Sequence, residues 1–339
     1  MASTAEELER IAGETGFSGA VRVERGGVVE FEGAFGLAHR GYGVPNTVGT
    51  RFAVASGTKG LTAVAVLALV QDGVLELGTT ARSVLGGDLP LIDDAVTVEQ
   101  LLGHRSGIGD YYGEDDNHVI TDYVLPVPVH ELAETEQFLA VLGGLPQESA
   151  PGERFVYNNG GYVVLALIAE RAGGVDFHDL VRTRVCEPAG MADTEFLRSD
   201  ELPGRAALGY LPLDGGARSN VFHLPVRGTG DGGIYSTVAD FGAFWAALFG
   251  GKILSPDSVA ELVRARSDDP DSGRGYGLGF WLHRDGRVVQ LEGYDPGVSF
   301  RSTHDTDSGL TCTVVSNTTD GTWPVTRRLE AELFGVKPA

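Results

Sequence analysis

The chain has 339 residues, of which 42% are hydrophobic, so it is long enough to form one large domain or two domains with a sizeable core. Its formal net charge is −21, and the acidic residues are spread along the chain. A charge of this sign repels phosphate backbones, so we expect no nucleic-acid partner. No apolar run reaches the length of a membrane span, so we expect no membrane partner either.

The first residues and the two cysteines indicate in which cellular compartment the protein is expected. Residues 1–7 have neither the basic start nor the apolar segment of a secretion signal, so we expect a cytoplasmic protein. The two cysteines, Cys186 and Cys312, lie far apart in ordinary apolar contexts. We favour two buried free thiols, with a single disulfide as the alternative.

The chain opens with a predicted helix over about residues 3–13, with a capping box from Ser3 to Glu6. Apolar and polar residues then alternate on either side of a Gly-Gly turn at residues 26–27, which predicts a β-hairpin. The strands expected in this region are 20–24, 28–32 and, as a third strand, 34–40.

The middle of the chain is predicted to be mostly helical with long loops. Residues 110–150 mix tyrosines, acidic residues and prolines, which indicates a loop-rich cover. Residues 203–233 are rich in glycine and predict a long loop. The expected helices are 56–70, 97–102, 130–143, 160–172, 177–185, 237–249 and 255–265.

The chain ends in further strands and a last helix. Strands from both ends of a chain most simply form one antiparallel sheet, with the first and last helices packed on it. The predicted fold is therefore α/β (α+β), with a central antiparallel sheet, flanking terminal helices and a helical middle lobe. We expect a single unit, 1–339, with an α/β lobe over about 1–75 and 230–339 and a helical lobe over about 76–229. The expected C-terminal elements are strands 277–283, 287–291, 298–302 and 310–316 and a helix over 324–334.

Ser56 and Lys59 are the first candidate catalytic residues. A short apolar run ends at Ser56 and an apolar helix begins there, so Lys59, three residues on, shares its face. A helix start disfavours a nearby ammonium, so a desolvated lysine there can be neutral and take the proton of a serine hydroxyl. The alternative is a capping serine with a lysine whose charged end reaches solvent.

Tyr157 and Asn159 form the second candidate group, in a turn just before an apolar helix. A tyrosine hydroxyl held near an amine can act as a general base or acid beside a serine. Asn159 offers a donor and an acceptor to a lysine or to a substrate amide. The alternative is a turn-forming Asn-Asn-Gly-Gly next to a core tyrosine.

These residues together resemble the serine β-lactamase and penicillin-binding-protein superfamily, and most of all the class C β-lactamase-like esterases and D-peptidases. That family carries S-x-x-K, then Y-x-N, then K-T-G or H-x-G on a strand. The resemblance extends over nearly the whole chain. Further stretches similar to the family are 101–107 (LLGHRSG), 151–159 (PGERFVYNN), 187–194 (EPAGMADT), 232–237 (GGIYST) and 276–280 (YGLGF).

The third family motif departs from the pattern. Counted back from the Pro296-Gly297 turn, it falls on Leu291, Glu292 and Gly293, so leucine replaces the usual Lys or His. In the family that residue helps to bind a substrate carboxylate and assists proton transfer. Its loss favours a neutral ester or amide over a β-lactam or D-peptide. Glu292 is expected to face the site and disfavour anionic substrates, or to prefer an amine; the alternative is an ordinary alternating strand.

The resemblance implies acyl transfer through a covalent ester of Ser56. Lys59, coupled to Tyr157, takes the hydroxyl proton, and Tyr157 then protonates the leaving group. The backbone N–H groups of Ser56 and Tyr294 are expected to form the oxyanion hole. The residues expected to bind substrate are Asn159, Tyr111, Tyr112, Glu292 and Gly293.

Three other patterns are set aside. Residues 228–233 match G-x-G-x-x-G, but Pro225 precedes them and no βαβ unit follows, so no dinucleotide is expected. Residues 130–134 begin like a zinc-protease helix but lack its second histidine, so we expect no metal and no cofactor. His104 lies outside any G-x-S-x-G motif and is predicted to be a buried structural histidine.

The expected function is a serine hydrolase that acts on a small ester or amide. The alternatives are an acyltransferase or amide synthase of specialised metabolism, a D-peptidase or β-lactamase, and a non-catalytic binding module. The expected partner in each catalytic case is a small-molecule ester, amide or lactam.

Overall fold

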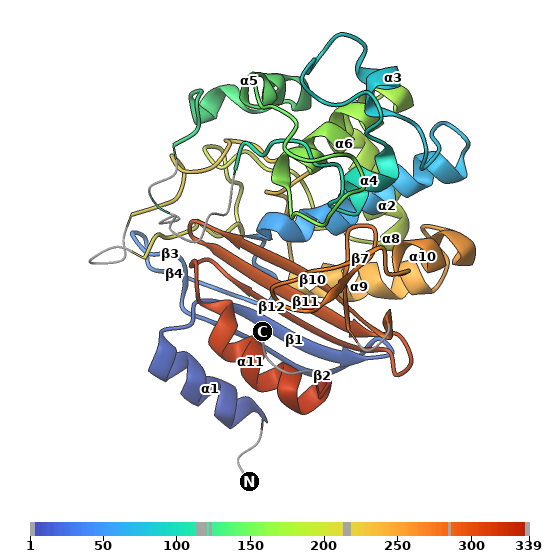
Figure 1. Cartoon of the computed structure of the whole chain (residues 1–339). Helices are drawn as coiled ribbons and strands as arrows, with labels where there is room; N and C mark the ends of the chain where they lie inside the picture. Colours follow the sequence, from blue (N-terminus) through green and yellow to red (C-terminus); the bar gives the residue numbers. More distant parts are fainter. Residues whose placement is uncertain (1–3, 113–120, 122–123, 213–217, 284–285, 336–339) are drawn as a thin grey trace.

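The computed structural model describes residues 4–112, 121, 124–212, 218–283 and 286–335. Its centre is an eight-stranded antiparallel sheet with the strand order β2-β1-β12-β11-β10-β9-β8-β7 (Figure 1). The strands of this sheet are β1 (Gly19–Arg25), β2 (Val28–Phe35), β7 (Ser267–Asp268), β8 (Gly275–Tyr276), β9 (Trp281–His283), β10 (Val288–Asp295), β11 (Val298–Asp305) and β12 (Leu310–Ser316).

The sheet joins the two ends of the chain. Strand β1 pairs with β2 on one side and with β12 on the other, both antiparallel, so the N-terminal hairpin lies beside the last strand. The predictions of a hairpin and of a shared antiparallel sheet are therefore confirmed. Successive side chains of a strand point to opposite faces, so each face of this sheet forms its own core.

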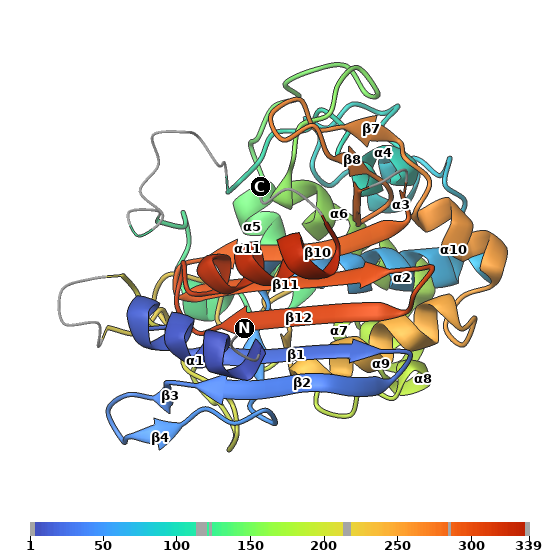
Figure 2. The same cartoon turned by 90° about the horizontal axis from the view of Figure 1, so that it is seen from below.

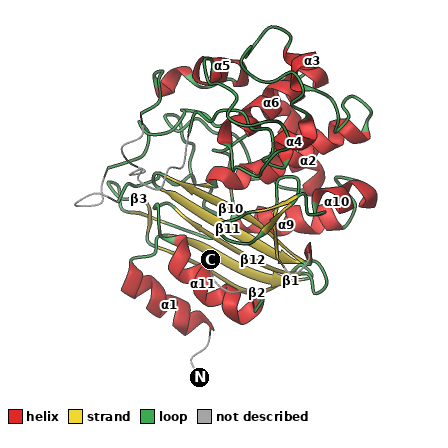
Figure 3. Cartoon of the chain, in the orientation of Figure 1, coloured by secondary structure: helices red, strands yellow, loops and turns green. Residues whose placement is uncertain are grey.

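Helices cover both faces of the sheet. On one face lie α1 (Thr4–Thr15) and α11 (Thr322–Leu333), whose apolar side chains pack on alternate residues of β1 and β12 (Figure 2). On the other face lie α2 (Thr58–Gln71) and α9 (Val238–Phe249). The remaining helices lie beyond α2, apart from α8 (Glu187–Ala189) and α10 (Pro256–Leu262), which pack beside α9 (Figures 1 and 3). The helices beyond α2 are α3 (Ala81–Leu85), α4 (Val98–Leu102), α5 (Leu139–Leu142), α6 (Asn159–Gly173) and α7 (Phe177–Val181).

The fold class agrees with the prediction, and the two-lobe division remains our proposal for its organisation. Some of the predicted strand boundaries were wrong. The expected third strand over 34–40 is instead β3 (Leu37–His39), which pairs with β4 (Val44–Pro45) in a separate two-stranded sheet. The expected strand over 277–283 is broken into β8 and β9, because the chain reverses there with Gly279 at a φ of 87°.

Two expected helices are also divided. The helix predicted over 130–143 is replaced by two short 3-10 helices, η2 (Val129–Glu131) and η3 (Thr135–Phe138), and by α5. The helix predicted over 177–185 is α7 followed by a π-helical turn, Arg182–Cys186. The predicted capping residue Ser3 lies outside the described residues.

The two cysteines are free and buried, as expected. Burial raises the pKa of the Cys186 thiol to about 12 and also raises the pKa of Cys312, so neither thiol is a nucleophile near neutral pH. Within the described residues, no helix is long and apolar enough to cross a membrane.

A buried ionic cluster holds α11 on the sheet. The carboxylate of Glu330, which is 4% exposed, accepts hydrogen bonds from Gln290 Nε2 at 2.9 Å, Arg301 Nη1 at 2.9 Å and Thr303 Oγ1 at 2.6 Å. These three partners come from β10 and β11. The C-terminal helix is thereby fixed against the strand that also borders the site described below.

We predict that Glu330→Ala lowers the free energy of unfolding by about 3 kcal/mol, because it leaves the Arg301 charge and two polar groups buried without this acceptor. Urea denaturation followed by circular dichroism measures the change. Glu332→Gln, on the exposed side of the same helix, is the matched control and is expected to change stability by less than about 0.5 kcal/mol. Equal effects of the two substitutions would contradict the role given to the cluster.

Candidate active site

Ser56 lies in a tight turn between the sheet and α2. It is the central residue of a short 3-10 helix, η1 (Ala55–Gly57), and Ala55 before it has a φ of 47°. Non-glycine residues seldom adopt this left-handed conformation, and such strain is frequent at functional sites. Ser56 does not cap α2, whose N-cap residue is Gly57 and has no side-chain hydrogen bond. The capping interpretation of Ser56 was therefore wrong.

Lys59 is buried and fully engaged. Only 2% of its surface is exposed, and its Nζ lies 2.8 Å from each of three oxygens: Ser56 Oγ, Asn159 Oδ1 and the backbone carbonyl of Asp231. The lysine therefore does not extend to solvent, which excludes the snorkelling alternative. It connects the start of α2 to the start of α6 and to the glycine-rich segment before β6 (Tyr235–Ser236).

The orientation of Asn159 follows from its other contacts. Its Nδ2 donates to the carbonyl oxygen of Tyr112 at 3.0 Å, so Oδ1 is the atom that faces Lys59. Its backbone N–H donates to Asp110 Oδ2 at 2.8 Å, and the N–H of Gly160 donates to Asp110 Oδ1 at 2.8 Å. Asp110 thus satisfies the N–H groups at the start of α6 and fixes Asn159 beside Lys59.

This geometry suits proton transfer from Ser56. Asn159 Oδ1 and the Asp231 carbonyl oxygen can only accept hydrogen bonds, so each takes an N–H of Lys59. A neutral lysine has two N–H groups and one lone pair. As an ammonium, Lys59 donates to all three oxygens. In its neutral form, with both N–H groups on Asn159 and the Asp231 carbonyl, its lone pair would face Ser56 Oγ and could accept the hydroxyl proton.

Tyr157 is held next to this group by aromatic packing. Its ring centroid lies 5.0 Å from Lys59 Nζ, and the ring is stacked on Trp281 with an interplanar angle of 6°. The His104 ring packs against it with centroids 4.3 Å apart. His104 is 1% exposed and holds the Asn158 N–H through Nδ1, and burial lowers its pKa well below the usual value. The prediction of a buried structural histidine is confirmed.

The glycine-rich segment wraps around the lysine and does not resemble a phosphate loop. A Cβ on Gly230 would lie 2.1 Å from the Tyr162 carbonyl oxygen, so glycine is needed for close packing against α6. This packing brings the Asp231 carbonyl to Lys59. The Asp231 carboxylate accepts a hydrogen bond from the Tyr111 hydroxyl at 2.6 Å, and burial raises its pKa.

Asp110 and Asp231 were missed by the sequence reasoning. The signal for Asp231 was present, because it lies inside the G-x-G-x-x-G pattern that was set aside. Asp110 had no local signal, since its partners lie about fifty residues further along the chain.

Gly293 brings β10 against the Ser56 turn. A Cβ on Gly293 would lie 2.1 Å from the Val54 carbonyl oxygen and 3.1 Å from the Gly57 nitrogen. Strand β9 pairs only with residues 288–290 of β10, so the part of β10 that carries Gly293 and Tyr294 lies beyond β9. The expected close backbone approach at Gly293 is therefore present. It puts the backbone of Tyr294 next to the turn, as an oxyanion hole there requires.

Leu291 and Glu292 point to opposite faces of the sheet. Leu291 is 2% exposed and packs against α2, where a Cβ on Gly60 would lie 2.4 Å from its Cδ2. Glu292 forms ion pairs with Arg301 and, at 3.3 Å, with Arg274. Arg301 and Arg274 hold the Glu292 pKa below its usual range despite the opposing effect of burial. Glu292 lies in the wall of the polar cleft beside Ser56, where these two arginines balance its charge. Its expected role in substrate selection stays a prediction.

Two clefts meet at Ser56. One, of about 770 Å³ including its open mouth, is mainly apolar and has Tyr111, Tyr112 and Asn159 in its wall, as predicted. Its other walls include Leu125, Phe138, Leu197, Leu224 and Val226. The second, of about 1620 Å³ including its open mouth, is polar and has Tyr157, Gly293 and Tyr294 in its wall. Its charged lining residues are Asp110, Glu148, Asp269, Asp271, Glu292 and Arg274.

Comparison with known proteins identifies the family. The family model described as Beta-lactamase matches residues 5–336. The chain belongs to this family. A penicillin-binding protein from Bacillus halodurans has a solved structure that is 34% identical, with a TM-score of 0.90, over 96% of this chain and 100% of the other. The resemblance inferred from the sequence is thereby confirmed, and with it the β-lactamase fold.

Two curated relatives extend the comparison. Penicillin-binding protein 4* of Bacillus subtilis is 28% identical over 94% of this chain and 73% of its own length. Esterase EstB of Burkholderia gladioli is 30% identical over 76% of this chain and 72% of its own length. This member of the beta-lactamase family is a serine hydrolase.

The buried Asp110 predicts a pH-dependent stability. Burial raises its pKa to about 6 from 3.8, so the folded protein binds this proton more tightly than the unfolded chain does. Stability contributed by the bound proton is therefore lost as the pH rises from about 4 to 6. Asp110→Asn cannot titrate, so the stability of the wild type relative to this variant should fall by about 2 kcal/mol over that interval.

Chemical denaturation of both proteins at several pH values measures this difference. Effects of the other buried carboxyl groups are common to the two proteins and cancel. A stability difference that stays constant between pH 4 and 6 would contradict the raised pKa.

Proposed function

We propose that this protein hydrolyses a small, neutral ester or amide through a covalent acyl-Ser56 intermediate. The observation that carries the proposal is the position of Lys59 Nζ, 2.8 Å from Ser56 Oγ, with two further oxygens that can only accept hydrogen bonds. A buried amine in this arrangement is a general base for the serine hydroxyl.

In the proposed first step, Lys59 takes the Ser56 proton while Oγ attacks the carbonyl carbon. The developing oxyanion is held by the N–H groups of Ser56 and Tyr294, and Tyr157 protonates the leaving group. In the second step, water attacks the acyl-Ser56 ester with the proton transfers reversed. The roles of all four residues are proposals that rest on their positions around the two clefts.

The charges around Ser56 support a neutral substrate. Leu291 stands where related enzymes carry Lys or His, and its side chain fills space against α2. The polar cleft contains five carboxylates and one guanidinium, that of Arg274, which is paired with Glu292. An anionic group entering this cleft would meet repulsion without an unpaired cation among its lining residues. The name of the relative EstB also favours ester hydrolysis.

Intact-protein mass spectrometry after brief exposure to p-nitrophenyl butyrate tests the intermediate. We predict a mass increase of one butyryl group in the wild type and none in Ser56→Ala. Lys59→Met keeps the side-chain length but removes the base, so acylation should slow by about 10²–10⁴-fold. Acylation of Ser56→Ala at the wild-type rate would overturn the assignment of the nucleophile.

The same assay with benzylpenicillin separates the related activities. A stable penicilloyl adduct with little ester turnover would replace the esterase proposal with a penicillin-recognising role. Acylation by neither compound would favour the non-catalytic binding module.

A second candidate is acyl transfer to an amine. The observation that favours it is the polar cleft itself, because its carboxylates attract a cationic amine and Phe155 offers an apolar contact for the body of that amine. Adding phenethylamine to the ester assay distinguishes the two functions. An amide product formed in preference to butyrate would support transfer, and butyrate alone would support hydrolysis.

The charge argument gives a further prediction. The wild type should have a higher kcat/KM for p-nitrophenyl butyrate than for the anionic p-nitrophenyl hemisuccinate. Removing three cleft charges in Glu148→Gln/Asp269→Asn/Asp271→Asn should lower this ratio of the two kcat/KM values about tenfold at low salt. Each charge would contribute about 0.5 kcal/mol at an assumed separation of about 9 Å in water. Asp257→Asn, a carboxylate outside the cleft, is the control. An unchanged ratio in the triple variant would contradict electrostatic selection.

A further inference from the structure

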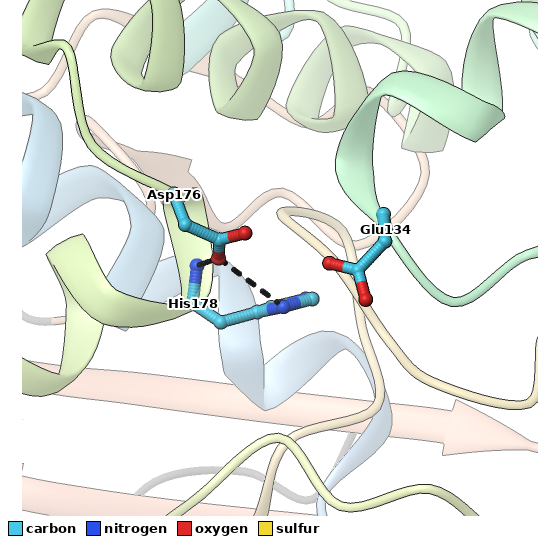
Figure 4. Close-up of side chains that lie close together, drawn as sticks. All are labelled: Glu134, Asp176 and His178. Carbon is cyan, nitrogen blue, oxygen red and sulfur yellow. Dashed lines mark hydrogen bonds and ion pairs between the residues drawn. The ribbon is translucent and has the colours of Figure 1, made fainter.

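Three side chains form a cluster behind the apolar cleft. Glu134 lies just before η3, and Asp176 and His178 lie at the start of α7. One ligand atom from each of the three lies within 4.8 Å of the others. Figure 4 shows the carboxyl groups of Asp176 and Glu134 facing the imidazole ring of His178. Exposed acidic groups often gather without a ligand, so the argument depends on the histidine.

The hydrogen bond on one side of the His178 ring identifies its tautomer. Nε2 lies 2.8 Å from the carbonyl oxygen of Gly228, which can only accept, so Nε2 carries the proton. In a neutral ring Nδ1 then presents a lone pair. Burial is the main cause that lowers the His178 pKa to about 4. The Asp176 and Asp179 carboxylates oppose this shift, and the Arg227 guanidinium adds to it.

The nitrogen on the other side of the ring, Nδ1, lacks a hydrogen-bond partner among the described residues. His178 is 6% exposed, and Nδ1 itself is buried. Nδ1 lies 3.5 Å from Asp176 Oδ1, so a lone pair faces a carboxylate. Asp176 Oδ1 also accepts the backbone N–H of His178 at 2.9 Å, which holds the carboxylate in this position. A cation between Oδ1 and Nδ1 would remove the remaining repulsion between these two electron-rich atoms.

The separation of His178 Nδ1 and Asp176 Oδ1 suits a small divalent ion, and Glu134 is an exposed side chain with a ligand atom within 4.8 Å of both. Zinc binds imidazole nitrogen and carboxylate oxygen at about 2.0–2.2 Å, so two ligand atoms of a tetrahedral site lie about 3.3–3.6 Å apart. The 3.5 Å separation of Nδ1 and Asp176 Oδ1 falls in this range. An Nε2–H donated to a backbone carbonyl is also the usual way in which a metal-binding histidine is oriented.

We propose that Glu134, Asp176 and His178 bind a divalent transition-metal ion, with zinc as the expected species and water completing the tetrahedron. The neutral imidazole ligand favours zinc over calcium or magnesium, which prefer oxygen ligands. The ion joins three segments, because His178 also holds the carbonyl of Gly228. Gly228 begins the segment whose Asp231 carbonyl contacts Lys59.

Arg227 is the local competitor for the ion. Its Nη1 lies 3.5 Å from Glu134 Oε1, while its Nε donates to the Phe196 carbonyl at 3.0 Å. A guanidinium at this position partly neutralises Glu134 and weakens its attraction for a metal. Arg227→Met should therefore tighten zinc binding if the ion and the arginine share the carboxylate.

Zinc titration of the chelator-treated, full-length protein by isothermal calorimetry tests the site. We expect one zinc per chain, with affinity reduced at least tenfold in Asp176→Asn and Glu134→Gln, which both remove one ligand charge. Asparagine is as good an N-cap residue as aspartate, so Asp176→Asn preserves the start of α7. Glu131→Gln removes a nearby exposed charge and should leave the affinity unchanged.

Thermal unfolding provides the second measurement, independent of any enzymatic activity. Zinc should raise the Tm of the wild type and of Glu131→Gln but not that of Asp176→Asn. Equal zinc affinity in the wild type, Asp176→Asn, Glu134→Gln and Glu131→Gln would overturn the proposed site. Zinc binding that appears only in Arg227→Met would also overturn the proposed site in the native chain. Arg227, and not a metal ion, would then be the cation that pairs with Glu134.

Discussion

The candidate site depends on one buried amine. Lys59 has almost no contact with water, so each of its hydrogen bonds must be supplied by the protein. The three oxygens that supply them come from η1, from α6 and from the glycine-rich segment before β6. None of these segments is adjacent to another in the sequence. The requirement to satisfy a single side chain therefore constrains how the helical part of the molecule packs against the sheet.

That constraint is transmitted through a second layer of polar groups. Asp110 holds the backbone at the start of α6 and thereby aims the Asn159 oxygen at Lys59. Gly230 permits the close approach to α6 that brings the Asp231 carbonyl into place. Thr62, one turn along α2 from Thr58, donates to the Gly230 carbonyl at 2.7 Å and fixes the same segment from the other side. Removal of any of these contacts would leave a polar group without its partner in a closely packed region.

The sequence predicted the parts of this arrangement that local periodicity determines. Ser56 and Lys59 share a helix face because they are three residues apart, and the alternation of residues 20–32 indicates the hairpin. Residues that meet only in the fold have no local sequence signal. Asp110 is an example, because its partners are the backbone N–H groups of Asn159 and Gly160 at the start of α6. The prediction of one helix over 130–143 was also wrong. The structure has two short 3-10 helices and α5 there, a division that local sequence periodicity did not indicate.

Strand β10 illustrates most clearly what a local sequence pattern does not determine. Alternation along a strand implies that residues 291 and 292 face opposite sides, but it cannot say which side holds the site. The structure turns Leu291 toward α2, where the small Gly60 makes room for it, and turns Glu292 toward Arg301 and Arg274. A cation at residue 291 would need polar partners in a place that is now packed with apolar atoms. The apolar packing of Leu291 against α2 and the ion pairs of Glu292 in the polar cleft are thus two consequences of a single strand register.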